Sequence, residues 1–258
     1  MMGKNAKTRV KYILDYINEN EFADVTVLSK NLGVSEMTIR RDLAKLYEDN
    51  CLLRVYGGAR SIPKEMYEAP LDKRILENKN EKVKIGEYAA QLINDGDIIA
   101  LDASSTSYEM AKFIKNRVTI VTNNISIVSL FVDNDLVEVV LLGGKVRKSS
   151  LSTVGFEMVS MMKNFHVDKA FISSKAIDFE HGLSDATVNE GEAKKAMINA
   201  SKQVYLMMDH TKIDKCAFYK VCDTSEINDI ITDHTENQEL YKEFYRKCEN
   251  LNIRVHLA

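Results

Sequence analysis

The stretch Val34–Leu43, VSEMTIRRDL, decides the fold of the first part of this chain. Ser35 is a good helix N-cap, because its hydroxyl can accept a backbone N–H of the first turn. Ile39 and Leu43, followed by Leu46, recur at i, i+4 and i+7 and make one apolar stripe for a core. The pattern therefore predicts a helix that begins after Ser35 and packs one face against other elements.

The remaining faces of this helix carry side chains that suit DNA. An arginine fork beside a short hydroxyl can reach base edges and phosphates in the major groove. The candidate DNA-binding residues of the helix are Ser35, Met37, Thr38, Arg40 and Arg41. We expect Asp42 to pair with an arginine of its own domain instead. A solvated helix with two surface arginines would show the same pattern, so the neighbouring elements must distinguish the two interpretations.

The preceding residues predict two more helices. The first is indicated by an apolar stripe at helical spacing, formed by Val10, Ile13, Leu14 and Ile17. The second is short and contains Val27, Leu28 and Leu32. We expect Thr26 as its N-cap and Gly33 as the left-handed residue that ends it. Two helices joined by a tight glycine-containing turn form a helix-turn-helix unit.

Residues 52–59, LLRVYGGA, follow the third helix and predict a small hairpin with a glycine turn. Arg54 and Tyr56 lie near that turn, where we expect them to approach the DNA backbone. Three helices followed by such a hairpin are typical of a winged helix-turn-helix. We therefore assign residues 1–62 to a DNA-binding domain of this type.

Composition narrows the class of protein. A chain of 258 residues can hold one small and one medium domain, and its 45% hydrophobic and 28% charged content is typical of soluble globular proteins. No apolar run approaches the length of a membrane span, and the N-terminus has no signal-peptide pattern, so we expect a cytoplasmic protein. The cysteines lack CxxC spacing and are expected to be unpaired: Cys51, Cys216, Cys222 and Cys248.

Charge is distributed unevenly along the chain. Residues 1–62 carry ten basic and eight acidic residues, a net charge of +2, whereas the remainder carries 25 and 30, a net charge of −5. A nonspecific polycation is therefore excluded. A DNA-binding domain this mildly basic predicts that tight binding needs two copies, so we expect a homo-oligomer, either a dimer or a tetramer.

Residues 63–78 contain both prolines and many charges without a clean period, and we interpret them as an interdomain linker. From residue 79 to 258, short apolar strands alternate with helices. This pattern predicts an α/β effector-binding domain with a mostly parallel sheet covered on both faces. The expected strands lie at 98–101, 118–122, 137–142, 169–172, 203–207 and 229–231, and the expected helices at 85–93, 108–115, 125–133, 188–200 and 237–248.

Polar loops follow several of these strands, and ligands of open α/β sheets collect at the carboxyl ends of strands. The first loop is rich in hydroxyls and precedes a helix, which suits a phosphate. Paired glycines in another loop let backbone approach a ligand, and lysine and arginine balance an anion. Any one loop is also explained by turn and capping chemistry. Together they predict a site for an anionic, hydroxylated molecule such as a sugar phosphate, with candidate residues Asp102, Ser104, Ser105, Thr106, Asn123, Gly143, Gly144, Lys145, Arg147, Lys194, Asp209 and Lys212.

The combined pattern closely resembles the DeoR family of bacterial transcriptional regulators. The matching stretches are VS at 34–35, TIRRDL at 38–43 and YGGA at 56–59, and the resemblance continues through the second domain. It implies a repressor of a carbohydrate catabolic operon, with a double-stranded DNA operator as partner. It also implies a C-terminal domain similar to ribose-phosphate isomerases that senses a phosphorylated sugar.

The same resemblance carries over to most of the candidate site residues, Lys145 and Arg147 excepted. The chain departs from the family pattern at Ala103 and Ser107, where glycine and threonine are usual, and at Ser173 and Ser174, where glycines are usual. Added side-chain bulk in these loops, where alanine or serine stands for glycine, is expected to narrow the pocket or change its ligand.

Two rival classes remain open. A sugar-phosphate isomerase or deaminase with an attached DNA module could use Asp102, Lys194 and Asp209 to move protons. A purely architectural DNA binder would leave the strand-end loops without a purpose. We expect a regulator without catalytic activity and without a cofactor or metal, because no ligand-like spacing is seen among the histidines, His166, His181, His210, His234 and His256.

Overall fold

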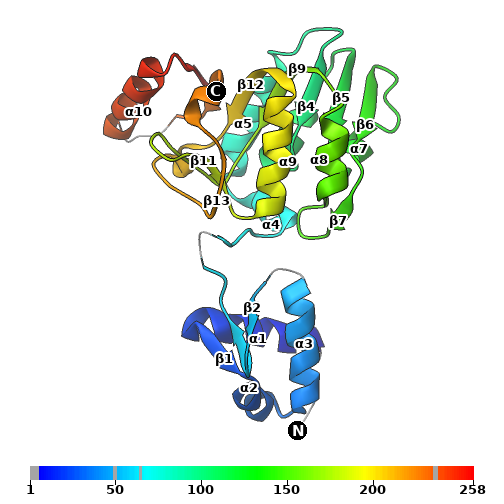
Figure 1. Cartoon of the computed structure of the whole chain (residues 1–258), viewed down its shortest axis with the longest axis vertical. Coiled ribbons are helices and arrows are strands. Elements are labelled where there is room, and N and C mark those ends of the chain that lie inside the picture. The colour runs from blue at the N-terminus through cyan, green and yellow to red at the C-terminus, as the bar shows by residue number, and fades with distance from the viewer. Residues whose placement is uncertain (1–5, 49–50, 64–65, 235–237) are drawn as a thin grey trace. The chain divides into compact units, whose positions relative to one another are not determined.

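The computed structural model describes residues 6–48, 51–63, 66–234 and 238–258. The chain forms two compact units, Met1–Tyr67 and Glu68–Ala258 (Figure 1). Each unit has a hydrophobic core of its own, so each is described by itself.

The smaller unit is a winged helix-turn-helix. Its strands form an antiparallel sheet in the order β1-β3-β2, and the predicted apolar stripes meet in one core around Ile13, Ile17, Leu28, Ile39 and Leu43. Its elements are α1 (Ala6–Asn20), β1 (Phe22–Asp24), α2 (Val25–Leu32), α3 (Glu36–Glu48), β2 (Leu53–Val55) and β3 (Gly58–Arg60).

The two ends of α2 show one prediction confirmed and one wrong. Gly33 ends the helix with φ 65° and ψ 34°, the left-handed conformation that glycine adopts at no steric cost. The N-cap is Asp24 rather than the predicted Thr26. The carboxylate of Asp24 accepts from the N–H groups of Thr26 at 2.7 Å and Val27 at 3.4 Å, so it satisfies two donors that the helix leaves unpaired.

The larger unit is built on a seven-stranded parallel sheet with the order β15-β14-β12-β9-β4-β5-β6. Because β4 lies between β5 and β9, the strand order reverses at β4, and such a switch point is where open α/β sheets bind ligands. The sheet consists of β4 (Ile98–Leu101), β5 (Val118–Thr122), β6 (Val137–Leu141), β9 (Val167–Ile172), β12 (Ser201–Met207), β14 (Asp229–Thr232) and β15 (Arg254–Leu257).

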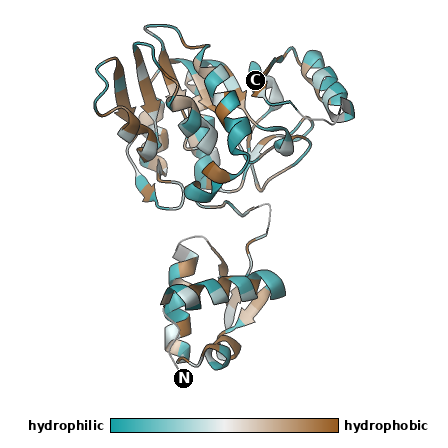
Figure 2. Cartoon of the chain, turned by 180° about the vertical axis from the view of Figure 1, so that it is seen from behind, coloured by the Kyte–Doolittle hydropathy of each residue, from teal (hydrophilic) through white to brown (hydrophobic). Residues whose placement is uncertain are grey.

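Helices cover both faces of this sheet, as predicted (Figure 1). Ile99 and Leu101 belong to a core that includes residues of α5, α6 and α7, whereas Ala100 between them belongs to a core that includes residues of α8, α9 and α10. Figure 2 shows the resulting pattern, with hydrophobic strands inside and hydrophilic residues on the helices. The helices are α5 (Lys79–Ala90), α6 (Ser105–Ala111), α7 (Ile125–Leu130), α8 (Phe156–Met162), α9 (Val188–Asn199) and α10 (Gln238–Asn250).

Several short elements were not predicted, including α8 and β15. At seven residues α8 is too short to show a clear period, and β15 (RVHL) is not a continuous apolar run. The others are the hairpin of β7 (Lys145–Arg147) and β8 (Ser152–Val154), a small antiparallel sheet of β10 (Ala176–Asp178), β11 (Gly182–Asp185) and β13 (Tyr219–Cys222), and the 3-10 helices η2 (His210–Lys212) and η3 (Thr224–Glu226).

The segment expected as a linker, residues 63–78, differs most from expectation. Residues 64 and 65 lie outside the described part of the chain, but from Glu68 onward the segment belongs to the larger unit. It contains α4 (Leu71–Leu76), whose first N–H donates to the carbonyl of Ser149 at 2.8 Å. Pro70 directly precedes α4, where a proline removes no helical hydrogen bond. The proline therefore marks a helix start.

None of the helices in the described ranges is both long and apolar enough to cross a membrane.

Candidate functional site

The third helix of the smaller unit, α3, is capped as predicted. The Ser35 hydroxyl accepts from the N–H of Thr38 at 3.2 Å and lies 3.0 Å from the Thr38 hydroxyl. Ile39 is fully buried, whereas Met37 is 74% exposed and the side chains of Arg40 and Arg41 lie in solvent. The helix therefore presents these three side chains on a free face.

The charged groups of α3 are engaged to different degrees. Arg40 lies 3.4 Å from Glu36, but both side chains are about half exposed, so this pair holds the arginine only weakly. Within the described residues, Arg41 makes no ion pair. Asp42 is buried and pairs with Arg9 at 2.5 Å, which joins α3 to α1. The expectation that Asp42 serves the domain and not DNA agrees with this contact.

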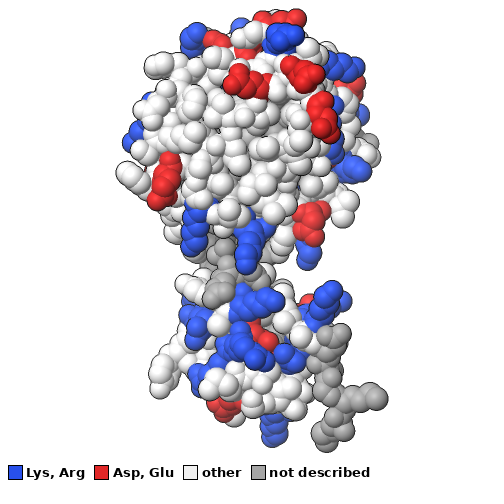
Figure 3. Space-filling model, turned by 90° about the vertical axis from the view of Figure 1, so that its right-hand side faces the viewer, with Lys and Arg blue, Asp and Glu red and all other residues white. Residues whose placement is uncertain are grey.

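The wing is the hairpin of β2 and β3. Val55 pairs with Gly58, so Tyr56 and Gly57 form the turn; the Tyr56 side chain is fully exposed, and Arg54 is exposed as well. A Cβ on Gly58 would stand 2.1 Å from the carbonyl of Ala23, so only glycine lets β3 pair with β1 here. Figure 3 shows that Lys and Arg side chains gather on the visible face of this unit.

In the larger unit, charged side chains converge where β4 and β9 end, at the reversal of strand order. Asp102 follows β4 and is buried. One of its oxygens accepts from the N–H of Ser173 after β9 at 3.1 Å, and the other accepts from the N–H of Ser104 at 3.2 Å and the hydroxyl of Ser107 at 2.5 Å. We call the group around it the strand-end cluster: Lys82, Asp102, Ser173, Asp185, Lys194, Asp209 and Lys212.

Two lysines of the cluster were predicted. Lys194 of α9 is buried, with its Nζ 2.8 Å from Asp185 and 3.5 Å from Asp102. Burial lowers the pKa of Lys194, but these carboxylates outweigh burial and hold the pKa above its usual value. Lys212 is half-buried and donates to the Ser173 hydroxyl at 2.8 Å. Burial lowers the pKa of Lys212, and Asp209 only partly opposes this.

Lys82 of α5 also belongs to the cluster, although sequence reasoning missed it. Its Nζ donates to the carbonyls of Arg74 and Glu77, at 2.5 Å each, and the residue is 5% exposed. Burial, together with the nearby Lys212, lowers the pKa of Lys82 to about 8. A signal was present, because Lys82 stands three residues before Ile85 on the apolar face of its helix.

Asp209 links the cluster to the start of α5. Its Oδ1 accepts from the side chain of Asn78 at 3.1 Å and from the N–H of Thr211 at 3.2 Å. Burial raises the pKa of Asp209, but Lys212 and the Thr211 hydrogen bonds outweigh burial, and the pKa is lowered. Asn78 closes the segment once expected as a linker, so that segment reaches the cluster directly.

Three predicted residues keep unused hydrogen-bonding groups near these strand ends. Ser105 and Thr106 are largely buried as residues, and no hydrogen bond of their hydroxyls is seen in the described part of the chain. Asn123 donates to the carbonyl of Thr153 at 2.9 Å, but its Oδ1 is buried without a partner. Buried polar groups are nearly always paired, so the Oδ1 of Asn123 is suited to a further partner.

The loop after β6 differs from expectation. Arg147 is buried between Glu68 and Glu190, the latter at 3.1 Å, so its charge is already balanced and it is not free to bind an anion. Gly144 has φ 137°, and a Cβ there would stand 2.7 Å from the carbonyl of Val154, so hairpin packing accounts for this glycine. Gly143 and Lys145 are exposed.

The departures from the family pattern have distinct roles. Ser107 donates to Asp102, as a threonine hydroxyl could, and Ser173 accepts from Lys212. Ser174 donates to the carbonyl of Ala176 at 3.0 Å, and Ala103 is buried. Ser173 therefore adds a hydroxyl to the polar network as well as bulk.

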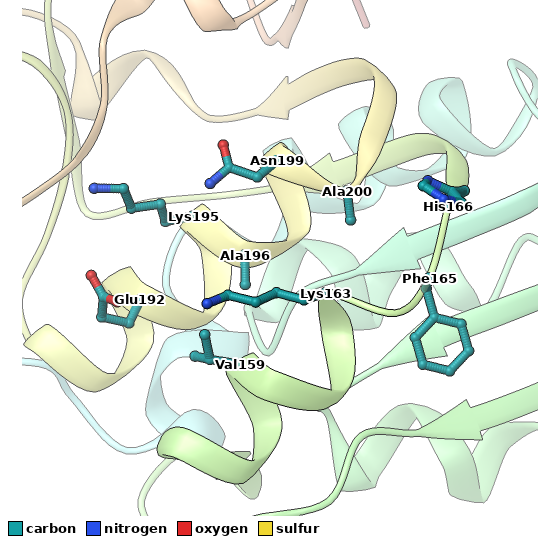
Figure 4. Close-up of a pocket in the computed structure, with 9 residues that line it drawn as sticks. All are labelled: Val159, Lys163, Phe165, His166, Glu192, Lys195, Ala196, Asn199 and Ala200. Carbon is teal, nitrogen blue, oxygen red and sulfur yellow. The ribbon is translucent and has the colours of Figure 1, made fainter.

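A groove of about 310 Å³ lies elsewhere on the larger unit, between α8 and α9 (Figure 4). Phe165 and His166 on its wall directly precede β9, and Asn199 and Ala200 directly precede β12. The groove therefore lies at the amino ends of these strands, away from the strand-end cluster. No polar side chain that lines it is buried, so it lacks the fixed polar groups that orient a ligand.

Comparisons with known proteins follow the same division of the chain. The DeoR-like helix-turn-helix domain matches residues 9–65, and the DeoR C-terminal sensor domain matches residues 77–234. The HTH-type transcriptional repressor GlcR of Bacillus subtilis is 37% identical over 232 residues, 89% of each chain. The HTH-type transcriptional regulator GolR of Listeria innocua is 32% identical over 238 residues, 92% of this chain and 94% of that protein.

Among solved structures, ribose 5-phosphate isomerase A from Methanocaldococcus jannaschii covers 53% of this chain and 55% of its own, with 17% identity and a TM-score of 0.40. That likeness is too low to bear on function. The winged helix-turn-helix, the α/β sheet domain and the two family matches together identify the chain as a DNA-binding transcriptional regulator that belongs to the DeoR family.

Proposed function

We propose that this protein is a repressor that binds operator DNA through α3 and the wing, and that a phosphorylated sugar bound at the strand-end cluster controls this binding. The observation that carries the proposal is the cluster itself. Buried lysines and aspartates meet at the switch point of the sheet, near the Oδ1 of Asn123, which is buried without a partner.

The chemistry of the cluster suits a ligand that is both anionic and hydroxylated. Lys82, Lys194 and Lys212 face three carboxylates, so the cluster as a whole is nearly neutral. Lys212 donates a hydrogen bond to the hydroxyl of Ser173 and is only half-buried. Of the three lysines it is therefore the one best placed to pair with a phosphate. Hydroxyls of the ligand would bond Ser105, Thr106 and the Oδ1 of Asn123, of which the Asn123 oxygen is buried without a partner.

A sensor accounts for these groups better than an enzyme does. The oxygens of Asp102 already accept three hydrogen bonds, and Lys194 is held in its charged form by two carboxylates. General acid–base catalysis needs a group that can exchange a proton with the substrate. Asp102 and Lys194 instead maintain the shape of the site, and the relatives named above are regulators. We therefore infer that the protein does not turn over its effector.

The segment of residues 68–78 offers a route from the ligand to the DNA-binding unit. It directly follows that unit, and it contacts the cluster through Asn78 and Asp209. Glu68, at its start, pairs with Arg147, which in turn pairs with Glu190 on the helix that carries Lys194. A ligand that binds Asp209 or Lys212 changes the hydrogen bond between Asn78 and Asp209, which holds this segment against the cluster. It alters DNA binding if it favours one arrangement of the segment over another.

We further propose that the protein acts in the cytoplasm as a dimer or tetramer on repeated half-sites. The smaller unit alone is mildly basic, and two copies on one DNA compensate for a weak single interface. Light scattering at micromolar concentration should show at least a dimer. A monomer that forms a one-to-one complex with operator DNA would contradict this.

A thermal-shift screen tests the ligand class. Phosphorylated sugars, their unphosphorylated forms and inorganic phosphate are compared on the full chain and on Thr106→Ala and Lys195→Ala. A ligand that binds only the folded state at a hundred times its Kd adds about 2.7 kcal/mol to stability. We expect a phosphorylated sugar to stabilise the wild type and Lys195→Ala but not Thr106→Ala.

Equal stabilisation of both variants would place the ligand elsewhere, and stabilisation by unphosphorylated sugars alone would refute the anionic ligand. The same compounds are then followed for isomerisation. Turnover of any of these compounds by the wild type would favour an enzyme instead.

A further inference from the structure

Three potential metal ligands meet on the larger unit outside the strand-end cluster. Asp178 ends β10, His181 lies in the turn before β11, and Cys216 lies in the loop after η2. One ligand atom from each residue lies within 4.8 Å of the other two. His181 and Cys216 are 35 positions apart in the chain, so sequence spacing did not reveal this group.

The backbone holds Asp178 and His181 in place. The Oδ1 of Asp178 accepts from the N–H groups of Glu180 and His181 at 2.9 Å each, and lies 2.8 Å from the Nδ1 of His181. Among the described residues, nothing donates to the Oδ2 of Asp178. The turn therefore orients the imidazole next to a carboxylate that keeps one oxygen free.

Cys216 is fixed from both sides. The N–H of Lys215 donates to the carbonyl of Ile177 at 3.1 Å, and the N–H of Ala217 donates to the hydroxyl of Ser184 at 2.8 Å. These bonds attach the loop to β10 and to β11 at the residues immediately before and after the cysteine. The thiol is exposed, so an ion can reach it from solvent.

We propose that Asp178, His181 and Cys216 form a binding site for a borderline-soft divalent transition-metal ion such as Zn²⁺. A thiolate, an imidazole and a carboxylate form a donor set that Zn²⁺ and Co²⁺ accept, whereas Ca²⁺ and Mg²⁺ prefer oxygen ligands. Three protein ligands leave one tetrahedral position for water. Binding releases the thiol proton of Cys216, because the thiolate is the ligand.

The site has a structural consequence for its neighbourhood. Cys216 stands four residues after Lys212, and the intervening residues run directly from η2 into the attached loop. A bound metal ties this loop to the β10–β11 turn and so restrains the segment that carries Lys212. Metal binding itself does not depend on the proposed sugar-phosphate ligand.

Cobalt spectroscopy on the full, reduced chain tests the proposal. The protein is freed of metal with a chelator and titrated with Co²⁺, and thiolate-to-cobalt charge-transfer absorption is recorded in the near ultraviolet. We expect a saturable band with one Co²⁺ per chain that Zn²⁺ abolishes and Mg²⁺ does not. Cys216→Ser should lose the band, and His181→Asn and Asp178→Asn should weaken Co²⁺ binding by about tenfold or more. The matched control, Cys51→Ser, should keep it.

A second measurement distinguishes loss of the metal site from misfolding of the variant. Amide hydrogen exchange of residues 213–217 should slow when Zn²⁺ is added to the wild type and remain unchanged in Cys216→Ser. No charge-transfer band in the wild type, or a band that persists in Cys216→Ser, would overturn the proposal. A band that disappears in Cys51→Ser would place the metal on the smaller unit and refute this site.

Discussion

The two units hold their cations in opposite ways. On α3, Arg40 and Arg41 are exposed, and the one ion pair they make among the described residues is weak. In the strand-end cluster, Lys82 and Lys194 are buried, and each is bound to carbonyls or carboxylates. Exposed cations can bind the phosphates of DNA and release its counterions, whereas buried cations pair with groups of the fold itself. Substitutions on α3 should therefore change DNA affinity, and those in the cluster should change stability.

The largest effect is expected for Lys194→Ala. Removal of this lysine leaves Asp102 and Asp185 buried without their cation, which costs about 3–5 kcal/mol of stability. Lys195→Ala is the matched control, because Lys195 is the next residue of the same helix and is exposed. Its effect should stay within about 0.5 kcal/mol. Urea unfolding measures both, and equal stabilities would show that the cluster is not the buried network described here.

A pH-dependent effect is expected for Lys82. Its pKa is about 8 in the folded protein but near 10.5 when unfolded, so between these values the unfolded chain binds more protons. The free energy of unfolding due to Lys82 therefore rises with pH across this window, by at most about 3 kcal/mol. This gain in the free energy of unfolding is lost as the pH falls to 8.

Urea unfolding of wild type and Lys82→Met at pH 7.5 and pH 10 isolates this contribution. The wild type should gain stability relative to the variant at the higher pH. A constant difference between the two proteins would mean that Lys82 titrates normally and is not desolvated.

Arg41→Ala should lower operator affinity by roughly 5- to 150-fold, the cost of one base-reading arginine, without a change in stability. If Arg41 contacts phosphate instead, the loss is similar for all sequences and the salt dependence of binding falls by about one counterion. Fluorescence anisotropy on DNA selected from a random pool measures both. Lys115→Ala, an exposed lysine of the larger unit, is the control. Wild-type affinity in both Arg40→Ala and Arg41→Ala would refute this recognition surface.

The smallest effect is expected for Ser35→Ala. Loss of the N-cap hydroxyl costs about 1 kcal/mol of stability in the smaller unit. Ser35→Asp should restore most of it, since aspartate caps equally well. Thermal unfolding of the chain measures the loss of stability, and amide hydrogen exchange in α3 shows where it occurs. A loss in the larger unit would contradict the assignment.

The sequence predicted best those regions whose structure depends on residues close together in the chain. Residues 35–46 contain the cap, the stripe and the exposed arginines of α3 together, so periodicity and capping were sufficient to predict it. Six of the seven parallel strands were found for the same reason, since each contains a short apolar run, whereas β15 (RVHL) alternates with polar residues and was missed. The cap at Asp24 was missed because aspartate and threonine are both good caps two residues apart.

The cluster was predicted only in its residue types. Lys194 and Asp102 were expected at strand ends, but their pairing depends on contacts between segments about 90 residues apart. Charge balance could not be foreseen either. Arg147 was expected to face a ligand, yet Glu68, taken as part of a linker, neutralises it. Lys82 was missed because a lysine in a charged helix is usually on the surface.

The most direct test of the central claim is the operator affinity of wild type, Thr106→Ala and Lys212→Ala, with and without the phosphorylated sugar that stabilises the wild type. We predict that the sugar weakens wild-type binding by about 5- to 150-fold, a coupling of about 1–3 kcal/mol. Thr106→Ala and Lys212→Ala should bind operator normally without the sugar and no longer respond to it. Variants that still respond fully, or that lose operator binding in the absence of the sugar, would contradict control through the strand-end cluster.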